Sequence, residues 1–179
     1  GKLATVDQLG VMMDVSALSA VGLQPVADAL DLTTQVPLDA SPDVWQNVAN
    51  TLGGVADVYG DDEKAAAPAK RYTISRLSPV FKRLGWENKP DDSSTTKQLR
   101  TRLIGQLSGL GDEAVLAEAR RRFEASATDP KALPPVGETN AAWALYLRTW
   151  RPGKPKPDSW PALYQQAVAA VRAPVGRSE

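Results

Sequence analysis

Residues 41–60, SPDVWQNVANTLGGVADVYG, have the pattern of a single amphipathic helix. Ser41 followed by Pro42 is typical of a helix start, because the hydroxyl can cap free N–H groups and proline fits the first turn. Gly60 is typical of a helix end. The apolar side chains recur at spacings of four, four, three and four residues, which places them on one helical face: Val44, Val48, Leu52, Val55 and Tyr59.

The helical period continues through the chain on both sides of this stretch. Thr5 and Gln8 have the spacing of a capping box at the start of the first helix. Pro68 and Pro79 fall within the fourth helix, so we expect that helix to be kinked or split. The patterns predict further helices over about residues 5–18, 25–33, 62–84, 96–110, 112–123, 138–150 and 158–172.

The fold class predicted from these patterns is all-α. No segment alternates as a strand does, and the sequence has no Asn-Gly or Asp-Gly hairpin turn. About seven or eight helices with short polar connections favour stacked antiparallel helical hairpins, in a HEAT-like superhelical bundle. No strict repeat is present, which disfavours ankyrin and tetratricopeptide arrays.

The composition excludes several kinds of catalytic site. The 179 residues include no histidine and no cysteine. The chain therefore cannot contain a zinc finger, a haem ligand, a Ser-His-Asp triad, a Cys-His pair or a disulfide. A metal site made only of carboxylates stays open. We assign no catalytic, cofactor-binding or metal-binding residue to this chain.

No segment is typical of a signal peptide or a membrane span. The most apolar stretch, residues 11–32, contains three aspartates, a glycine and a proline, and Lys2 is the only basic residue before it. We therefore expect a soluble chain with no membrane partner, and the compartment stays open. The chain starts with Gly1 instead of methionine, which suggests a trimmed start or a piece cut from a longer chain.

The charges balance in total but are unevenly distributed. The chain has 21 basic and 21 acidic residues. Residues 1–60 contain one lysine and seven aspartates, a net charge of −6, whereas residues 61–135 and 136–179 each have a net charge of +3. Two interpretations are open: solvated helix faces with a chance bias, which we favour, or an acidic surface that faces a cationic partner or another domain.

Three charged clusters are candidate binding sites, and each has a simpler structural explanation. Arg120–Arg122 could bind a phosphate or a carboxylate, but the flanking Glu118 and Glu124 favour local ion pairs. Asp61–Glu63 could bind a hard cation, but this cluster lacks the spacing of a calcium loop. The dipole at a helix start better explains these acids and Asp91–Asp92.

The five tryptophans are the strongest recognition candidates, at positions 45, 86, 143, 150 and 160. We expect Trp45 to lie in the core and Trp86 to cover a helix end. Trp150 and Trp160 flank a joint rich in proline and lysine, residues 151–158, where the rings could stack on nucleotides or the prolines could dock in an aromatic groove. An extended linker held by a tryptophan at each end is the interpretation that we favour.

A series of short motifs is similar, in order and spacing, to the C-terminal helical domain of the M1 zinc aminopeptidases. The resemblance covers about residues 6–135. The motifs are DVSAL (14–18) with Gly22, ALDLT (29–33), DVW (43–45), LGW (84–86), LR (99–100), GD (111–112), AEARRRF (117–123) and LPP (133–135).

The resemblance implies a HEAT-like domain that caps the active-site chamber and contacts the peptide substrate. The catalytic domain of the same parent protein is then its partner, and Zn²⁺ is expected in that domain. The family's zinc helix of two histidines and a glutamate is absent here, as is its Gly-Ala-Met-Glu-Asn loop. The resemblance therefore implies a part of a peptidase, with no cofactor in this chain.

We predict two regions on this basis. Residues 1–135 form the HEAT-like helical domain, and residues 136–179 form a divergent terminal helical pair around the joint at 151–158. The leading function is that of a non-catalytic C-terminal domain, which shows no aminopeptidase turnover by itself. Its peptide specificity and oligomeric state stay open.

Two other functions are considered. The first alternative is a free-standing helical-repeat module that binds another protein along a concave face. The second is weak binding of nucleic acid by the basic, tryptophan-rich tail, through Arg148, Arg151, Lys154 and Lys156. The leading hypothesis expects no nucleic acid as a partner.

Overall fold

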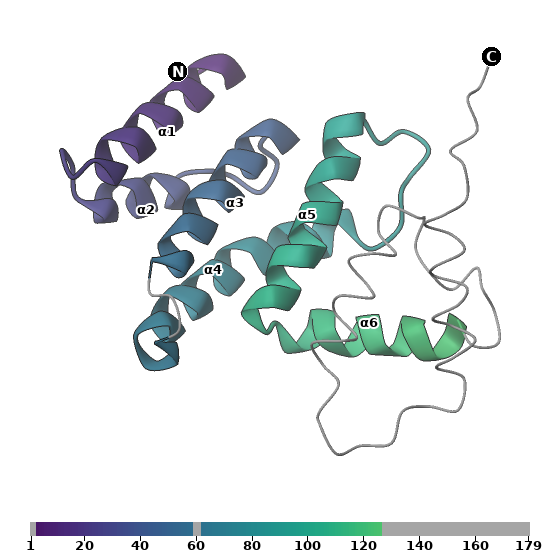
Figure 1. The fold of residues 1–179 in the computed structure, drawn as a ribbon. Coiled ribbons are helices and arrows are strands. Elements are labelled where there is room, and N and C mark those ends of the chain that lie inside the picture. Colours follow the sequence, from purple (N-terminus) through teal and green to yellow (C-terminus); the bar gives the residue numbers. More distant parts are fainter. Residues whose placement is uncertain (1–2, 59–61, 127–179) are drawn as a thin grey trace, which may run out of the picture. The chain divides into compact units, whose positions relative to one another are not determined.

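A computed structural model describes residues 3–58 and 62–126, and all of its regular structure in these ranges is α-helical. This confirms the all-α prediction. The predicted helices at 138–150 and 158–172 lie outside the described residues, and the HEAT-like superhelix stays a prediction. The helices are α1 (Thr5–Ala20), α2 (Val26–Thr34), α3 (Pro42–Asp57), α4 (Glu63–Leu84), α5 (Ser94–Leu110) and α6 (Glu113–Ser126), shown in Figure 1.

Local side-chain caps start four of these helices. Ser41 and Asp62 accept hydrogen bonds from the backbone N–H three residues later, at 3.4 and 3.0 Å. Ser93 and Asp112 do the same at 3.1 and 3.0 Å. Each bond satisfies one of the N–H groups that a helix start leaves without an intrahelical partner. The helix start predicted at Ser41 is confirmed.

The capping box predicted at Thr5 is wrong. Thr5 is already the first residue of α1, and the N-cap position is Ala4, whose methyl group cannot accept a hydrogen bond. The Gln8 amide instead donates to the Leu3 carbonyl oxygen at 2.8 Å. The helix start therefore lies one residue earlier than the capping-box spacing indicated.

Of the two alternatives expected for α4, the split is wrong and the kink stays a prediction. The helix runs without interruption through Pro68 and Pro79. Each proline removes one backbone hydrogen bond, but α4 packs along both α3 and α5 and buries side chains on both sides of Pro79. Burial of Leu77, Val80 and Phe81 stabilises the helix against that loss, because packing contributes more to helix stability than propensity does.

The chain divides into two compact units, Gly1–Leu110 and Gly111–Glu179. In the first unit, consecutive helices reverse direction, and α3 packs against α1, α2, α4 and α5 (Figure 1). The apolar stripe that the sequence predicts on α3 is buried at Val44, Val48 and Leu52, and this helix lies at the centre of the unit's core. The largest fully buried apolar side chains are Trp45, Leu52, Leu77, Leu99, Leu103, Ile104, Leu107, Val44 and Val48.

Candidate interaction surface

Exposed apolar side chains are concentrated in the first third of the chain. Among the side chains that the structure describes, the exposed large hydrophobic ones lie between positions 3 and 58. The outward faces of α4 and α5 contribute none of them. The exposed residues are Leu3, Val6, Val11, Met13, Leu18, Val21, Leu23, Val26, Leu38 and Val58.

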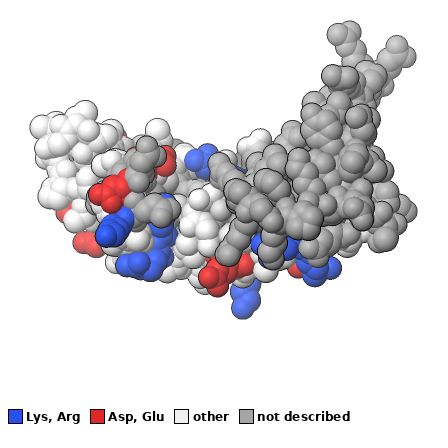
Figure 2. All heavy atoms as spheres, turned by 60° about the horizontal axis from the view of Figure 1, so that its bottom comes forward, with Lys and Arg blue, Asp and Glu red and all other residues white. Residues whose placement is uncertain are grey.

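The same stretch is also the acidic one. Residues 3–58 contain no lysine and no arginine, and all seven of their aspartates are exposed. Figure 2 shows one face of the molecule, with the described Asp and Glu side chains in red and the described Lys and Arg side chains in blue. The aspartates come from α1, α2, the α2–α3 connection and α3, so the acidity belongs to this whole layer of helices.

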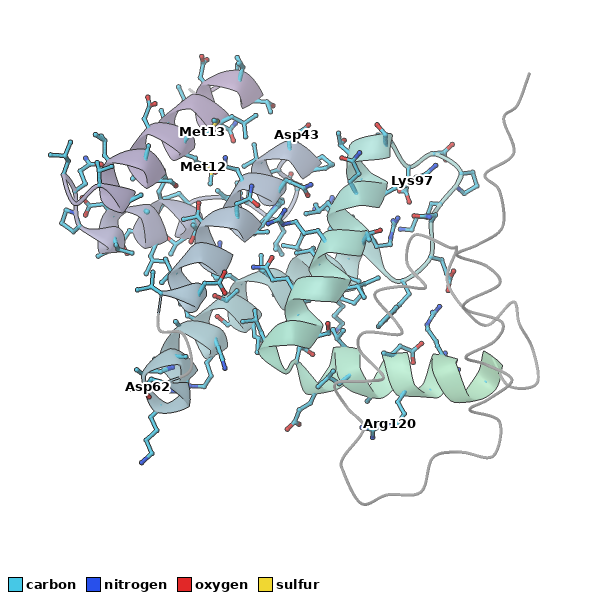
Figure 3. The ribbon with its side chains drawn as sticks, viewed as in Figure 1. Met12, Met13, Asp43, Asp62, Lys97 and Arg120 are labelled. Atoms are coloured by element: carbon cyan, nitrogen blue, oxygen red, sulfur yellow. The ribbon has the colours of Figure 1, made fainter. Side chains whose placement is uncertain are left out.

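Helix α1 is apolar on both of its sides. The side chains of Met12 and Met13 are 4% and 59% exposed, although they are neighbours in sequence. Met12 lies on the side that faces α2 and α3, and Met13 lies on the outer side (Figure 3). Helix α1 therefore presents apolar side chains on its outer side as well as on its packed side.

Two shallow grooves flank the inner side of α1. The first, of about 430 Å³, is lined by Leu3, Gln8, Val11, Met12, Leu32, Gln35, Val36 and Pro37. The second, of about 370 Å³, is lined by Ser16, Ser19, Ala20, Val26, Ala29, Asn50, Thr51, Gly54, Val55 and Val58. Neither lining contains a charged side chain, so the grooves suit apolar contacts better than acid–base chemistry.

Side chains of α4 hold α2 in place beside these grooves. The Arg76 guanidinium donates a hydrogen bond to the Thr33 carbonyl oxygen at 2.6 Å, at the C-terminal end of α2. A cation there is favourable because the carbonyl end of a helix carries partial negative charge. The same guanidinium lies 5.8 Å from the centroid of the Trp45 ring, and Tyr72 donates to the Leu30 carbonyl oxygen at 3.3 Å.

The tryptophan predictions are confirmed at the two positions that the structure describes. Trp45 is 1% exposed in the core, and its Nε1–H donates to the Pro37 carbonyl oxygen at 3.1 Å. Trp86 packs edge-on against Phe81 in the last turn of α4, with the ring centroids 5.3 Å apart. Trp143, Trp150 and Trp160, and with them the joint at 151–158 and the four basic residues of the tail, lie outside the described residues.

A buried arginine closes the connection between α4 and α5. Arg100 is fully buried, and its Nε–H donates to the Gly85 carbonyl oxygen at 3.1 Å. One Nη donates to Asp92 Oδ2 at 2.6 Å and to the Leu84 carbonyl oxygen at 3.5 Å, and the other donates to Asn88 Oδ1. Arg100 therefore holds together the end of α4 and the connecting segment.

The sequence interpretation of Asp92 needs correction for this reason. Its carboxylate pairs with Arg100, whereas the hydroxyl of Ser93 caps α5. The signal that could have revealed the pair is the position of Arg100, which lies within the apolar stripe of Leu99, Leu103 and Ile104. A charged side chain in such a stripe needs a buried partner.

Hydrogen bonding lowers the pKa of the Asp92 carboxyl below its usual value. The main cause is the backbone N–H of Lys89, which donates to Oδ2 at 2.7 Å, and the Arg100 guanidinium adds to it. A carboxyl whose pKa is lower in the folded state stabilises the fold above its unfolded-state pKa, and that contribution is lost as the pH falls.

The arginine cluster on α6 forms local ion pairs, as predicted. Arg121 binds both carboxylate oxygens of Glu118, each at 2.7 Å, and Arg122 binds Oε1 at 2.9 Å. Arg121, and after it Arg122, lower the pKa of Glu118 to about 2. The third arginine, Arg120, is exposed. Two of the three cations are thus already engaged by a carboxylate.

One residue of the acidic cluster at the start of α4 has a described role. Asp62 caps α4, whereas Asp61 and the Glu63 side chain lie outside the described residues. Within residues 3–58 and 62–126, no group of three or more His, Cys, Asp or Glu side chains could hold a metal ion. In the same ranges, no helix combines the length and apolar character of a membrane span.

Comparison with known proteins relates this helical chain to one family. The family model described as the ERAP1-like C-terminal domain matches residues 1–176, which is farther than the quoted motifs reach. Aminopeptidase M1-A of Oryza sativa subsp. japonica is 29% identical over 154 residues, which are 83% of this chain and 17% of the rice protein. Glutamyl aminopeptidase of Sus scrofa is 27% identical over 131 residues, 73% of this chain and 14% of the pig protein.

A yeast relative gives the same picture. Aminopeptidase 2, mitochondrial, of Saccharomyces cerevisiae is 27% identical over 122 residues, which are 68% of this chain and 13% of the yeast protein. The chain thus spans less than a fifth of the length of the relatives that it matches. An all-helical chain that matches one family model over nearly its whole length belongs to the ERAP1-like C-terminal domain family of the M1 aminopeptidases.

Proposed function

We propose that this chain acts as the non-catalytic C-terminal domain of an M1-type aminopeptidase. Its role is to dock on the catalytic part, close the active-site chamber and contact the distal end of the peptide substrate. The observation that carries this proposal is the family match over residues 1–176, together with the small share of each relative that the chain covers.

The chain's own residues do not fit the family's zinc. Catalytic zinc sites use three protein ligands, drawn mostly from histidine, glutamate and cysteine, and this sequence contains no histidine or cysteine. No described group of carboxylates could hold a metal ion. We therefore place the zinc ligands elsewhere in the parent polypeptide and assign this chain a binding role.

The surface of the first unit supports a docking role. Ten large apolar side chains between residues 3 and 58 are exposed to solvent, and we take this concentration as a sign of an interaction surface. The apolar, uncharged linings of both grooves point the same way. Catalysis by this chain would instead call for titratable groups brought together in a cleft.

A chimera tests the proposal. In rice Aminopeptidase M1-A, the segment matched by this chain is replaced with the chain itself, and release of the N-terminal residue from a short peptide is measured. We expect the chimera to retain activity that a truncated enzyme without the segment lacks. A folded chimera that is no more active than the truncated enzyme contradicts the proposal.

The chain alone provides a second test and addresses the alternative of a free-standing interaction module. We expect the isolated chain to release no N-terminal residue from the same peptide, with or without added Zn²⁺. Turnover by the isolated chain overturns the proposal. If the chain is a free-standing module, the chimera should be inactive and the isolated chain should bind another protein. These two results distinguish the module from the C-terminal domain of an aminopeptidase.

A further inference from the structure

The outer side of α1 has a regular apolar stripe of its own. Val6, Gly10, Met13 and Ala17 follow one another at spacings of four, three and four residues, so they lie on one face of the helix. All four are exposed, Val6 at 73% and Met13 at 59%. At 1.5 Å per residue the stripe is about 17 Å long, which is the length of three helical turns.

Gly10, which has no side chain, leaves a hollow in this stripe between Val6 and Met13. A Cβ atom added to Gly10 would have no neighbour within 4 Å, and Ala17, at the end of the stripe, presents only a methyl group. Small residues between larger ones let the ridge of a second helix approach closely, as in ordinary helix packing. The shape therefore fits a helix better than a loop or a flat sheet.

The charge beside the stripe selects the partner. Asp7 and Asp14, seven residues apart, lie along one flank of the same face and are exposed. No lysine or arginine is present between residues 3 and 58 to neutralise them. A partner that carries Lys or Arg at matching positions would form ion pairs with these carboxylates, whereas an acidic partner would be repelled.

We propose that the outer face of α1 binds an α-helix that has a continuous apolar stripe and Lys or Arg along the flank next to Asp7 and Asp14. This helix belongs to the remaining polypeptide of the M1-type aminopeptidase, so the inference rests on the proposed function. The matched segments are 13–17% of the relatives' length, which leaves ample chain to supply it.

Two other occupants fit the surface less well. A second copy of the chain, packed antiparallel on α1 across a two-fold axis, would bring the aspartate-bearing flanks of the two helices together without any intervening cation. An anionic membrane surface would be repelled by the same aspartates. Charge thus separates the helix proposed here from both.

Binding of designed peptides to the 179-residue chain tests the proposal. The probe is a 20-residue helical peptide with a leucine stripe and lysines along one flank, and the matched control peptide has glutamate in place of each lysine. We expect the lysine peptide to bind at low salt and to weaken as salt is added. The glutamate peptide should bind at least about tenfold more weakly.

Gly10→Leu separates loss of binding from loss of folding. The leucine improves helix propensity, so the variant should unfold at the same or a higher denaturant concentration than the parent chain. It also fills the hollow, so the lysine peptide should bind about tenfold more weakly. The matched control is Gly54→Leu. Gly54 is also an exposed helical glycine with no neighbour within 4 Å of an added Cβ. It lines the groove on the inner side of α1 instead of the outer face.

The outcomes are distinct. Equal binding of the lysine and glutamate peptides, or weaker binding in Gly54→Leu than in Gly10→Leu, overturns the proposal. If the chain forms a dimer and Gly10→Leu disrupts it, the occupant is a second copy and the proposal is overturned. Binding of the chain to anionic vesicles overturns the proposal in favour of a membrane. In the active chimera, Gly10→Leu should lower activity, and unchanged activity contradicts this inference alone. An inactive chimera contradicts the proposed function. Selective binding of the lysine peptide would still support the helix site in that case.

Discussion

The α1–α2 hairpin and the α3–α5 group differ in where they place their apolar side chains. In α3, α4 and α5, large apolar residues such as Trp45, Leu77 and Leu103 are buried, and the outward faces are polar. In α1 and α2, only Met12, Ala29 and Thr33 are buried, and large apolar side chains face outward. The α3–α5 group buries its large apolar side chains within the unit, whereas the α1–α2 hairpin has the composition of an interface.

This difference indicates how the two regions divide their tasks. Buried contacts among α3, α4 and α5 set the stability of the unit, because apolar burial is the main favourable term in folding. The outer face of α1 contributes little to that stability, so its apolar residues are explained by contacts outside the described part of the chain. Substitutions that affect one region and not the other test the division.

We expect the largest effect from Trp45→Ala. Removing a fully buried indole should lower the free energy of unfolding by about 3–5 kcal/mol, through lost burial and the cavity that remains. Urea unfolding followed by circular dichroism measures the change. Leu38→Ala, at a position that is 49% exposed, is the control and should change stability by no more than about 0.5 kcal/mol. An unchanged midpoint for Trp45→Ala contradicts the assignment of the core.

Arg100→Ala should be the next most damaging substitution. It leaves Asp92 without its cation and two backbone carbonyl groups without a donor, for an expected loss of about 3 kcal/mol. Arg100→Lys should rescue only part of this loss, because an ammonium group lacks the planar fork of donors. A double-mutant cycle with Asp92→Asn measures the coupling, and additive effects of the two substitutions argue against the pair.

The adjacent methionines of α1 provide the most direct comparison of the two sides. Met12→Ala should lower the free energy of unfolding by at least about 2 kcal/mol, because the side chain is 4% exposed. Met13→Ala should change it by no more than about 0.5 kcal/mol. Denaturant unfolding of both variants is the measurement. Equal losses would mean that the outer face of α1 also supports the fold.

Asp62→Ala should have a smaller effect at the start of α4. Loss of the side-chain bond to the Ala65 N–H is expected to cost about 1 kcal/mol. Asp62→Asn serves as the matched variant, since asparagine caps helices about as well as aspartate. If the two variants are equally destabilised in denaturant unfolding, the charge of Asp62 matters more than its capping bond.

The Asp92 carboxyl makes part of the stability of the α4–α5 connection dependent on pH. Because its pKa is lowered in the folded state, its contribution is complete above the unfolded value of about 4 and is lost as the pH falls further. The stability difference between the parent chain and Asp92→Asn should therefore shrink as the pH falls below about 4. Denaturant unfolding at a series of pH values measures it, and a difference that stays constant contradicts the prediction.

Much of the candidate surface could be predicted from the sequence. The absence of Lys and Arg between residues 3 and 58 and the seven aspartates are visible in the printed chain, as are the helices that carry them. The exposure of Val6 and Met13 could not be predicted, because α1 has apolar residues on both sides. Only its packing against α2 and α3 shows which side is left open.

The sequence by itself determined the helices, because their caps and their spacing of apolar residues depend on neighbours three or four positions away. Ser41 and Asp112 are examples whose caps follow from local sequence alone. The tertiary structure decided what depends on distant partners. Packing against α3 and α5 keeps α4 continuous through its prolines. Burial of Arg100 among carbonyl oxygens fixes the α4–α5 connection. The free energy of both comes from contacts between residues far apart in the sequence, which a local pattern does not show.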